Sequence, residues 1–197
     1  MKKGYLLSGA LFGAAFLAMQ AMPVKACTEI YVGKDLSTTG QTIYGRTEDG
    51  GKNNLKLYDV KQAGAIKAGS SFTDAEGWTY TWGNQDSYRY TSVRDAKELW
   101  DGSSQTCYEA QGTNQYGVSI SATESLYENE KTDAADPYAD SKTVGEHGIG
   151  EQSFTTIVLG QAKTAREGID IILDAVDKSK CSEPSGILVG DANETWY

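Results

Sequence analysis

The sequence predicts an α+β fold in which antiparallel strands come first and helices follow. Between residues 27 and 124, apolar and polar residues alternate over several short segments, as they do in half-buried strands. Over residues 154–178 the apolar residues instead recur at the spacing of a helix. A short apolar segment at residues 186–191 then has the character of a buried strand. Runs of strands followed by helices are typical of α+β domains.

The first strands are predicted to form a hairpin. Residues 27–33 and 42–49 each alternate as a strand, and the polar segment 34–40 between them has the composition of a turn. Residues 55–60 alternate like a third strand. Aromatic residues alternate over 78–82 and return over 88–91, which predicts a second hairpin with its turn at Gly83-Asn84. We interpret these aromatic residues as strand packing in preference to a ligand cage.

The second half of the chain mixes a strand, a loop and helices. Residues 112–117 have the composition of a turn, and residues 118–124, which include β-branched side chains, are expected to form a strand. The polar, acidic segment 127–150 is expected to be a long exposed loop. Within the helical region, Thr164 and Glu167 have the spacing of a capping box, so a new helix is expected to begin at Thr164.

Residues 1–26 have the pattern of a secretory signal peptide. Lys2 and Lys3 precede an apolar segment over residues 5–19, and Val24-Lys25-Ala26 places small residues at the −3 and −1 positions of a cleavage site. The segment is too short for a stable membrane span, and no second apolar run of that length follows. We therefore expect a protein exported to the cell envelope or secreted. A lipoprotein signal that lipidates Cys27 is an alternative, although Lys25 fits that pattern poorly.

Composition points to a folded domain and excludes some classes of partner. The chain carries a net charge of −9, and loss of the three lysines in residues 1–26 would make it −12. Such acidity argues against nucleic acid and anionic membrane surfaces as partners. A hydrophobic content of 39% supports a packed core, and residues 27–197 would suit one domain. Both a monomer and a homo-oligomer are compatible with this composition.

Cysteine and histidine usage bears on redox state, metals and cofactors. Of the three cysteines, Cys107 and Cys181 either pair with each other or remain thiols, and Cys27 is the free one. The single histidine, His147, and the absence of a C-x-x-C pair argue against a metal site. No glycine-rich phosphate-binding motif is present, so we expect no cofactor.

Cys27 is the candidate nucleophile. Cleavage after Ala26 would make it the first residue, so that one residue carries both a thiol and a free α-amine. An α-amine ordinarily has a pKa of about 7.7–8.0 and can serve as a base near neutral pH. No histidine is then required, and we interpret His147 as a solvent-exposed loop residue rather than a catalytic partner.

Four blocks resemble the dipeptidase A family of cysteine peptidases, which are N-terminal-nucleophile hydrolases distantly related to penicillin V acylase and bile salt hydrolase. They are Cys27-Thr28 with the following strand and Arg46-Thr47-Glu48-Asp49, then residues 117–125, 163–168 and 190–196. They cover nearly all of residues 27–197 in the family's order. The resemblance implies a four-layer αββα sandwich with antiparallel sheets and hydrolysis of small peptides, with dipeptides as substrates.

The resemblance also implies site residues. Cys27 matches the nucleophile, and Arg46 and Asp49 match an Arg-x-x-Asp pair beside it. Because residues i and i+3 of a strand point to opposite faces, this pair needs a bend to converge. Arg46 would favour the thiolate or bind a carboxylate, and Asp49 would hold an ammonium group. Thr123, together with Asp191 or Asn193, matches positions on the substrate and oxyanion side.

The sequence departs from the family in length, because dipeptidases of this type are typically more than twice as long. We therefore expect residues 27–197 to be the N-terminal part of a peptidase domain whose sandwich is incomplete here. Two alternatives to an exported dipeptidase stay open at this point. One is an amidase of the same fold that acts on bile-salt or penicillin-type amides, and the other is a lipid-anchored binding protein.

Overall fold

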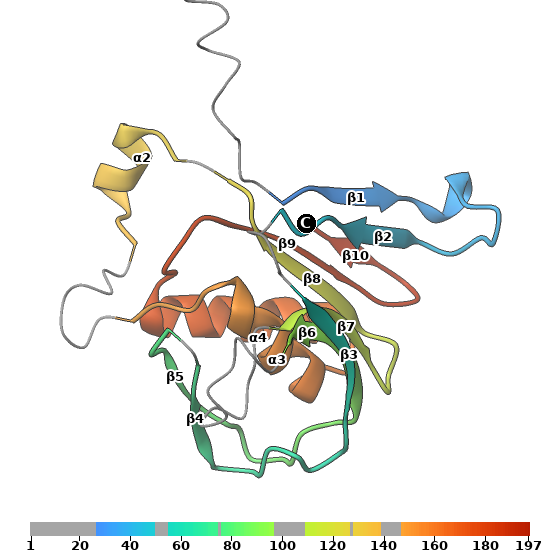
Figure 1. Ribbon diagram of the computed structural model, residues 1–197, viewed down its shortest axis with the longest axis horizontal. Coiled ribbons are helices and arrows are strands. Elements are labelled where there is room, and N and C mark those ends of the chain that lie inside the picture. The colour runs from blue at the N-terminus through green and yellow to red at the C-terminus, as the bar shows by residue number, and fades with distance from the viewer. Residues whose placement is uncertain (1–26, 50–54, 75, 97–108, 127, 139–146) are drawn as a thin grey trace, which may run out of the picture.

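A six-stranded antiparallel sheet forms the centre of the fold (Figure 1). The computed structural model describes residues 27–49, 55–74, 76–96, 109–126, 128–138 and 147–197, so the predicted signal peptide and Cys107 lie outside the described residues. The strand order is β10-β9-β8-β7-β6-β3. The strands are β3 (Lys56–Lys61), β6 (Tyr90–Asp95), β7 (Glu109–Asn114), β8 (Ser119–Glu124), β9 (Ser185–Gly190) and β10 (Thr195–Trp196).

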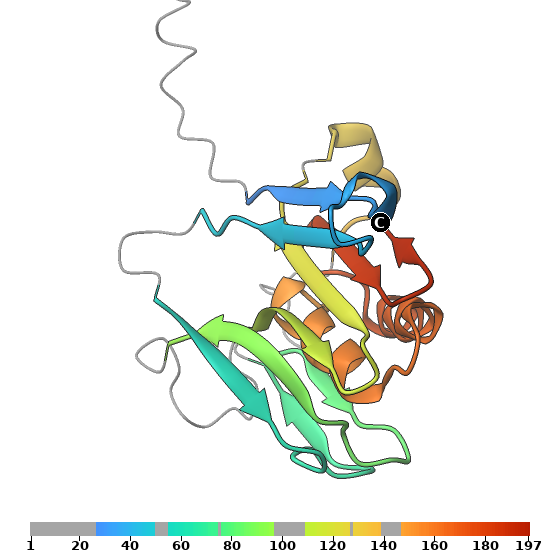
Figure 2. The ribbon, with the colours of Figure 1, turned by 90° about the vertical axis from the view of Figure 1, so that its right-hand side faces the viewer.

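Two helices cover one face of this sheet (Figure 2). Helix α3 (Glu151–Gln161) packs on β7 and β8, and α4 (Ala165–Ser179) lies beside it. The predicted helix start is confirmed, because the Thr164 side chain accepts a hydrogen bond from the Glu167 N–H at 3.1 Å. The Glu167 carboxylate accepts from the N–H of Lys163, one residue before the position expected for a capping box.

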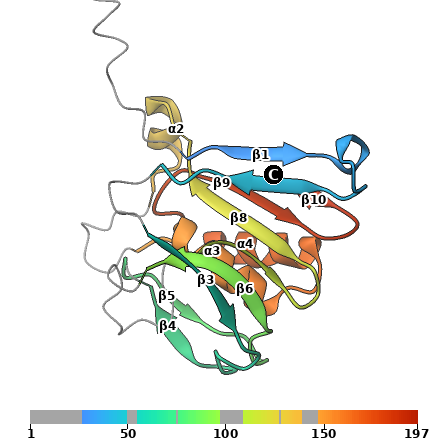
Figure 3. The same ribbon diagram turned by 45° about the vertical axis from the view of Figure 1, so that its right-hand side comes forward.

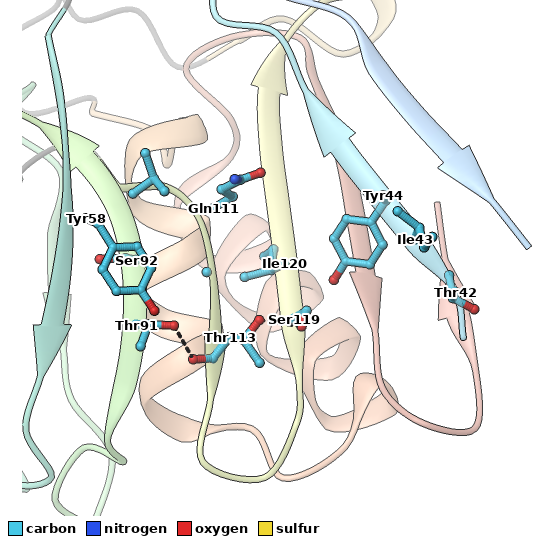
Figure 4. A pocket seen from close by; sticks show the side chains of 12 residues that line it. Thr42, Ile43, Tyr44, Tyr58, Thr91, Ser92, Gln111, Thr113, Ser119 and Ile120 are labelled. Atoms are coloured by element: carbon cyan, nitrogen blue, oxygen red, sulfur yellow. Dashed lines mark hydrogen bonds between the residues drawn. The ribbon is translucent and has the colours of Figure 1, made fainter. Parts of the chain in front are cut away.

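The predicted first hairpin is confirmed and packs on the opposite face of the sheet. Strand β1 (Glu29–Val32) pairs antiparallel with β2 (Ile43–Arg46), and the short 3₁₀ helix η1 (Lys34–Leu36) lies between them. Figure 4 shows Tyr44 of β2 beside Ser119 of β8, with the helices behind the sheet. A pocket of about 410 Å³ lies between the hairpin and this face of the sheet. The described residues thus form a helix layer, a six-stranded sheet and a two-stranded sheet on its other face, which confirms the α+β class with antiparallel sheets.

The predicted second hairpin was wrong in its pairing. Strand β5 (Thr79–Thr81) pairs with β4 (Ser71–Thr73), whereas β6 pairs with β3 and β7. The reason is a tight turn before β5, in which the Asp74 carboxylate accepts hydrogen bonds from the N–H groups of Glu76 and Trp78. The packing interpretation of the aromatic residues agrees with the structure, since the rings of Phe72, Trp78, Tyr80 and Trp82 contact one another.

Three further expectations need correction. Residues 112–114 end strand β7, and the turn lies at residues 115–117, where Gly117 adopts a φ of +82°. The segment 127–150 contains helix α2 (Glu130–Ala135). The Asn129 side chain caps this helix by accepting hydrogen bonds from the N–H groups of Lys131 and Thr132. His147 is half-buried rather than exposed, because its ring lies against Gly77.

Helix α3 is buried along most of its length, because the sheet lies on one side of it and the aromatic hairpin β4–β5 on another (Figure 3). The Trp82 ring meets Gly160, and the Tyr80 hydroxyl accepts a hydrogen bond from the Gln161 amide at 3.0 Å. On the sheet side, Leu159 lies over Gly112 of β7. At the opposite end of α3, the Glu151 carboxylate accepts a hydrogen bond from the Glu124 N–H at the end of β8, where the candidate site lies.

Candidate active site

The candidate site begins where the hairpin ladder ends. Beyond β1 and β2, the Thr28 N–H donates to the Thr47 hydroxyl at 3.0 Å, and the Thr47 N–H donates to the Thr28 carbonyl at 2.9 Å. Cys27 immediately precedes Thr28 and therefore lies one residue beyond the last hydrogen-bonded pair of the hairpin. Its side chain and that of Arg46 converge, with 3.4 Å between Arg46 Nη2 and the Cys27 sulfur.

Arg46 is held on several sides and its side chain is only 4% exposed. Its Nη1 group donates to the backbone carbonyls of Ala110 on β7 and Ala122 on β8. Its Nη2 group also donates to the Glu48 carboxylate at 2.5 Å. Because a guanidinium offers several N–H groups in one plane, it can bind these groups and the sulfur together. A cation beside a thiol favours the thiolate, the form that attacks a carbonyl carbon.

Glu151, the first residue of α3, is a second anionic neighbour of Arg46. Its carboxylate lies 3.7 Å from Arg46 Nη2 and accepts a hydrogen bond from the Glu124 N–H at 2.8 Å. The Glu151 N–H in turn donates to the Glu183 carboxylate at 2.8 Å. Burial raises the pKa of Glu151 to about 7 although the positive charge of Arg46 acts against the rise, and burial raises that of Glu183 to about 6. The site therefore contains carboxyl groups that titrate near neutral pH.

Sequence reasoning missed both carboxylates that contact Arg46. It singled out Asp49, which is exposed and lies beyond the end of β2. Glu48 pairs with Arg46 because the chain leaves the strand after Arg46, so strand alternation no longer decides which side chains share a face. Glu48 lies within the Arg46–Asp49 block that resembles the family, so its position two residues after Arg46 in the sequence was an available signal. Nothing local marked Glu151, since the fold brings it to Arg46 from a distant helix.

Thr123 is near this end of the sheet and fully buried. It lies on β8 next to Ala122, whose carbonyl binds Arg46, and its hydroxyl is 2.6 Å from that of Ser125. The hydroxyl also donates to the Gly186 carbonyl at 3.4 Å. Its assignment to the substrate side stays a prediction.

Asp191 and Asn193 lie at the other end of β8 and β9. Gly190 pairs with Ser119, the first residue of β8, and Asp191 shares a pocket of about 290 Å³ with the turn of the hairpin. The Asp191 carboxylate accepts hydrogen bonds from the N–H groups of Ala165, Asn193 and Glu194. Although partial burial acts to raise it, these three backbone donors lower the pKa of Asp191. The described residues do not bring Asp191 or Asn193 to Cys27, so their substrate role stays a prediction.

The expectations about cysteine pairing, metal ligands and membrane spans can be compared with the structure only over the described residues. Cys27 and Cys181 are free thiols, and the proposed partner of Cys181, Cys107, lies outside the described residues. Within the described ranges, no three His, Cys, Asp or Glu side chains gather as metal ligands. In the same ranges no helix has the length and apolar character needed to cross a membrane.

Comparison with known proteins identifies the family. Residues 26–197 match the profile of peptidase family C69. The chain belongs to this family. The predicted relation to dipeptidases is also confirmed, because proteins named as dipeptidases match most of the chain.

Two of these relatives show the extent of the match. Probable dipeptidase B of Streptococcus pyogenes serotype M1 is 34% identical over 173 residues, which are 87% of this chain and 32% of that protein. The dipeptidase of Bifidobacterium longum (strain NCC 2705) is 36% identical over 181 residues, with the same two coverages. The chain thus spans about a third of the length of these relatives. Among solved structures, penicillin V acylase from Agrobacterium tumefaciens can be superposed on 85% of this chain. The match covers 44% of the acylase chain, with 16% sequence identity and a TM-score of 0.46.

Proposed function

We propose that this C69 peptidase is an exported dipeptidase whose nucleophile is the thiol of Cys27 at the mature N-terminus. The observation that carries the proposal is the 3.4 Å approach of Arg46 Nη2 to the Cys27 sulfur, with Arg46 anchored by two strands. The dipeptidases among its relatives support peptides as the substrate class.

The chemistry follows from one residue that bears both a nucleophile and a base. The free α-amine takes the thiol proton as the sulfur attacks the carbonyl carbon of the dipeptide. The carbonyl oxygen becomes an oxyanion in the tetrahedral intermediate, and backbone or side-chain donors near Cys27 would stabilise it. The C–N bond then breaks, the leaving amine takes the proton from the α-ammonium, and an acyl-thioester remains. Water hydrolyses the thioester, which releases the amino acid and restores the thiol.

Substitution of the nucleophile in the full-length protein tests the proposal. Cys27→Ala should abolish dipeptide hydrolysis. Cys27→Ser should retain at most a small fraction of the wild-type activity, because a hydroxyl is a much weaker nucleophile at neutral pH. Cys181→Ala is the matched control, since Cys181 is a half-buried free thiol elsewhere in the same chain. It should lose stability at most. Dipeptide turnover by Cys27→Ala at the wild-type rate would refute the proposal.

Substrate class is tested in the same assay. A panel of dipeptides should be cleaved in preference to N-acyl amides of the bile-salt and penicillin type. Preference for the N-acyl amides, with Cys27 still required, would instead identify an amidase that uses the same nucleophile.

A further inference from the structure

Glu151 differs from the other carboxylate at Arg46 in how firmly it is held. The Glu151 side chain is 6% exposed, whereas that of Glu48 is 23% exposed. The Glu124 N–H of β8 binds the Glu151 carboxylate, and Glu151 begins a helix that is buried along most of its length. The N-terminus of a helix also favours a negative charge. Glu151 is therefore a rigid anion beside the guanidinium.

The two terminal nitrogens of Arg46 have different partners, and this indicates how the Glu151 carboxylate could affect the site. Nη1 is taken by the carbonyls of Ala110 and Ala122. Nη2, the nitrogen nearest the Cys27 sulfur, is the one that faces both Glu48 and Glu151. A carboxylate fixed to α3 and β8 can hold Nη2 in place, whereas Glu48 is more exposed and lies only two residues from Arg46 in the same segment.

We propose that Glu151 is a positioning residue whose ionised carboxylate holds the Arg46 guanidinium against the Cys27 thiol. The proposal rests on the proposed role of Cys27 as the nucleophile. Glu151 itself does not reach the reacting atoms and acts through Arg46. Loss of its charge should leave Arg46 bound to Glu48 and withdrawn from the sulfur, so that the thiol reacts more slowly.

Ionisation of Glu151 then makes the site sensitive to pH. The charged groups that face it are Arg46 and Glu48 from the hairpin segment and Glu183 from the segment before β9, while Glu124 at the end of β8 contributes its backbone N–H. Glu48 also pairs with Lys56 of β3. Because the pKa of Glu151 is raised to about 7, the carboxylate is present above that pH and is lost below it. Thiol reactivity should fall correspondingly as the pH drops through 7.

Alkylation of Cys27 by iodoacetamide measures this directly and needs no peptide substrate. The thiolate forms a carbon–sulfur bond and displaces iodide, and mass spectrometry assigns the adduct to Cys27. Glu151→Gln should alkylate about tenfold more slowly at pH 8, because the guanidinium loses the anion that lies 3.7 Å from Nη2. Its rate profile should also lack the inflection near pH 7 that we expect for the wild-type protein.

Two matched variants separate positioning from a general effect of charge or folding. Glu183→Gln removes a neighbouring half-buried carboxylate for which no contact with Arg46 is seen, while it keeps an acceptor for the Glu151 N–H. Its alkylation profile should keep the inflection and only move it to lower pH, because the charge of Glu183 helps to raise the pKa of Glu151. Glu151→Asp keeps the charge and should keep the inflection even where it folds less stably. Equal loss in Glu183→Gln and Glu151→Gln, or a wild-type profile in Glu151→Gln, would overturn the proposal.

Failure of the proposed function would look different. If no dipeptide were cleaved but the alkylation profile of Cys27 still depended on Glu151, the positioning role would stand without the dipeptidase. If dipeptides were cleaved through Cys27 and Glu151→Gln left the alkylation profile unchanged, the dipeptidase would stand and the positioning role would be wrong.

Discussion

Arg46 is the residue on which the geometry of the candidate site depends. It joins the hairpin to β7 and β8 through two backbone carbonyls and reaches the Cys27 sulfur with the nitrogen that also binds Glu48. A lysine has the same charge, but its single ammonium cannot reproduce this planar arrangement of donors. The guanidinium geometry, and not the charge alone, is therefore what the site requires.

Arg46→Lys should accordingly reduce kcat/KM for dipeptides by about 10²- to 10³-fold, the loss typical of removing one donor that acts on the reacting groups. Glu48→Gln should cost less, because Glu151 still holds the guanidinium from the other side. Steady-state kinetics of both variants, beside a circular dichroism spectrum that checks folding, provides the measurement. An Arg46→Lys enzyme as active as Glu48→Gln would show that charge alone suffices.

Asp191 illustrates how elements are joined at the end of the sheet away from Cys27. Its carboxylate accepts from the first N–H of α4 and from two N–H groups of the β9–β10 turn. Asp191→Ala leaves these donors without a partner and should lower the free energy of unfolding by about 1–3 kcal/mol. Asp191→Asn keeps one acceptor oxygen and should cost less. Urea unfolding measures both, with the exposed Asn193→Ala as the control.

The same variants decide whether Asp191 also binds substrate. A structural residue should change stability and leave KM near the wild-type value in protein that is fully folded. A substrate-binding residue should raise KM in Asp191→Asn, where stability is largely retained. An unchanged KM in that variant would contradict the role that the family resemblance implied for Asp191.

Strand β7 and helix α3 approach each other closely at Gly112. A Cβ atom there would lie 2.5 Å from Leu159 of the helix and would also meet the backbone carbonyl of Thr91 on β6. Since backbone cannot rotate away, Gly112→Ala should lower the free energy of unfolding by about 1–3 kcal/mol. Gly45→Ala is the matched strand control, because a Cβ at Gly45 meets nothing within 4 Å. Equal melting temperatures for the two variants would show that the helix can shift without cost.

Across the whole molecule, the sequence predicted those features whose signals are local. The first hairpin follows from alternation, and the start of α4 follows from the spacing of Thr164 and Glu167. The partner of β5 was mispredicted because strand alternation does not specify which segment pairs with it, and the short Asp74 turn decided that instead. Glu151 could not be found from local sequence, because only the packing of α3 on β8 brings it to Arg46.

A single cleavage between Ala26 and Cys27 should both remove the predicted signal peptide and free the α-amine that we propose as the base. The hairpin ladder ends at Thr28 and Thr47, so cleavage between Ala26 and Cys27 breaks none of the backbone hydrogen bonds that hold β1. Intact-mass analysis of active protein should therefore give a chain that begins with an unmodified Cys27. A diacylglyceryl adduct on that residue would favour the lipid-anchored alternative.

A cleavage-site variant tests whether the new amine matters. Ala26→Tyr places a large side chain where the signal pattern needs a small one, so the precursor should persist with Cys27 in a peptide bond. Its thiol should still react with iodoacetamide, because Arg46 is unchanged. Its dipeptidase activity should nevertheless be lost, because a peptide nitrogen cannot take the proton that an α-amine takes. Dipeptide turnover by the uncleaved precursor would show that the base is some other group, and the carboxylates of Glu48 and Glu151 beside Arg46 would be the first candidates.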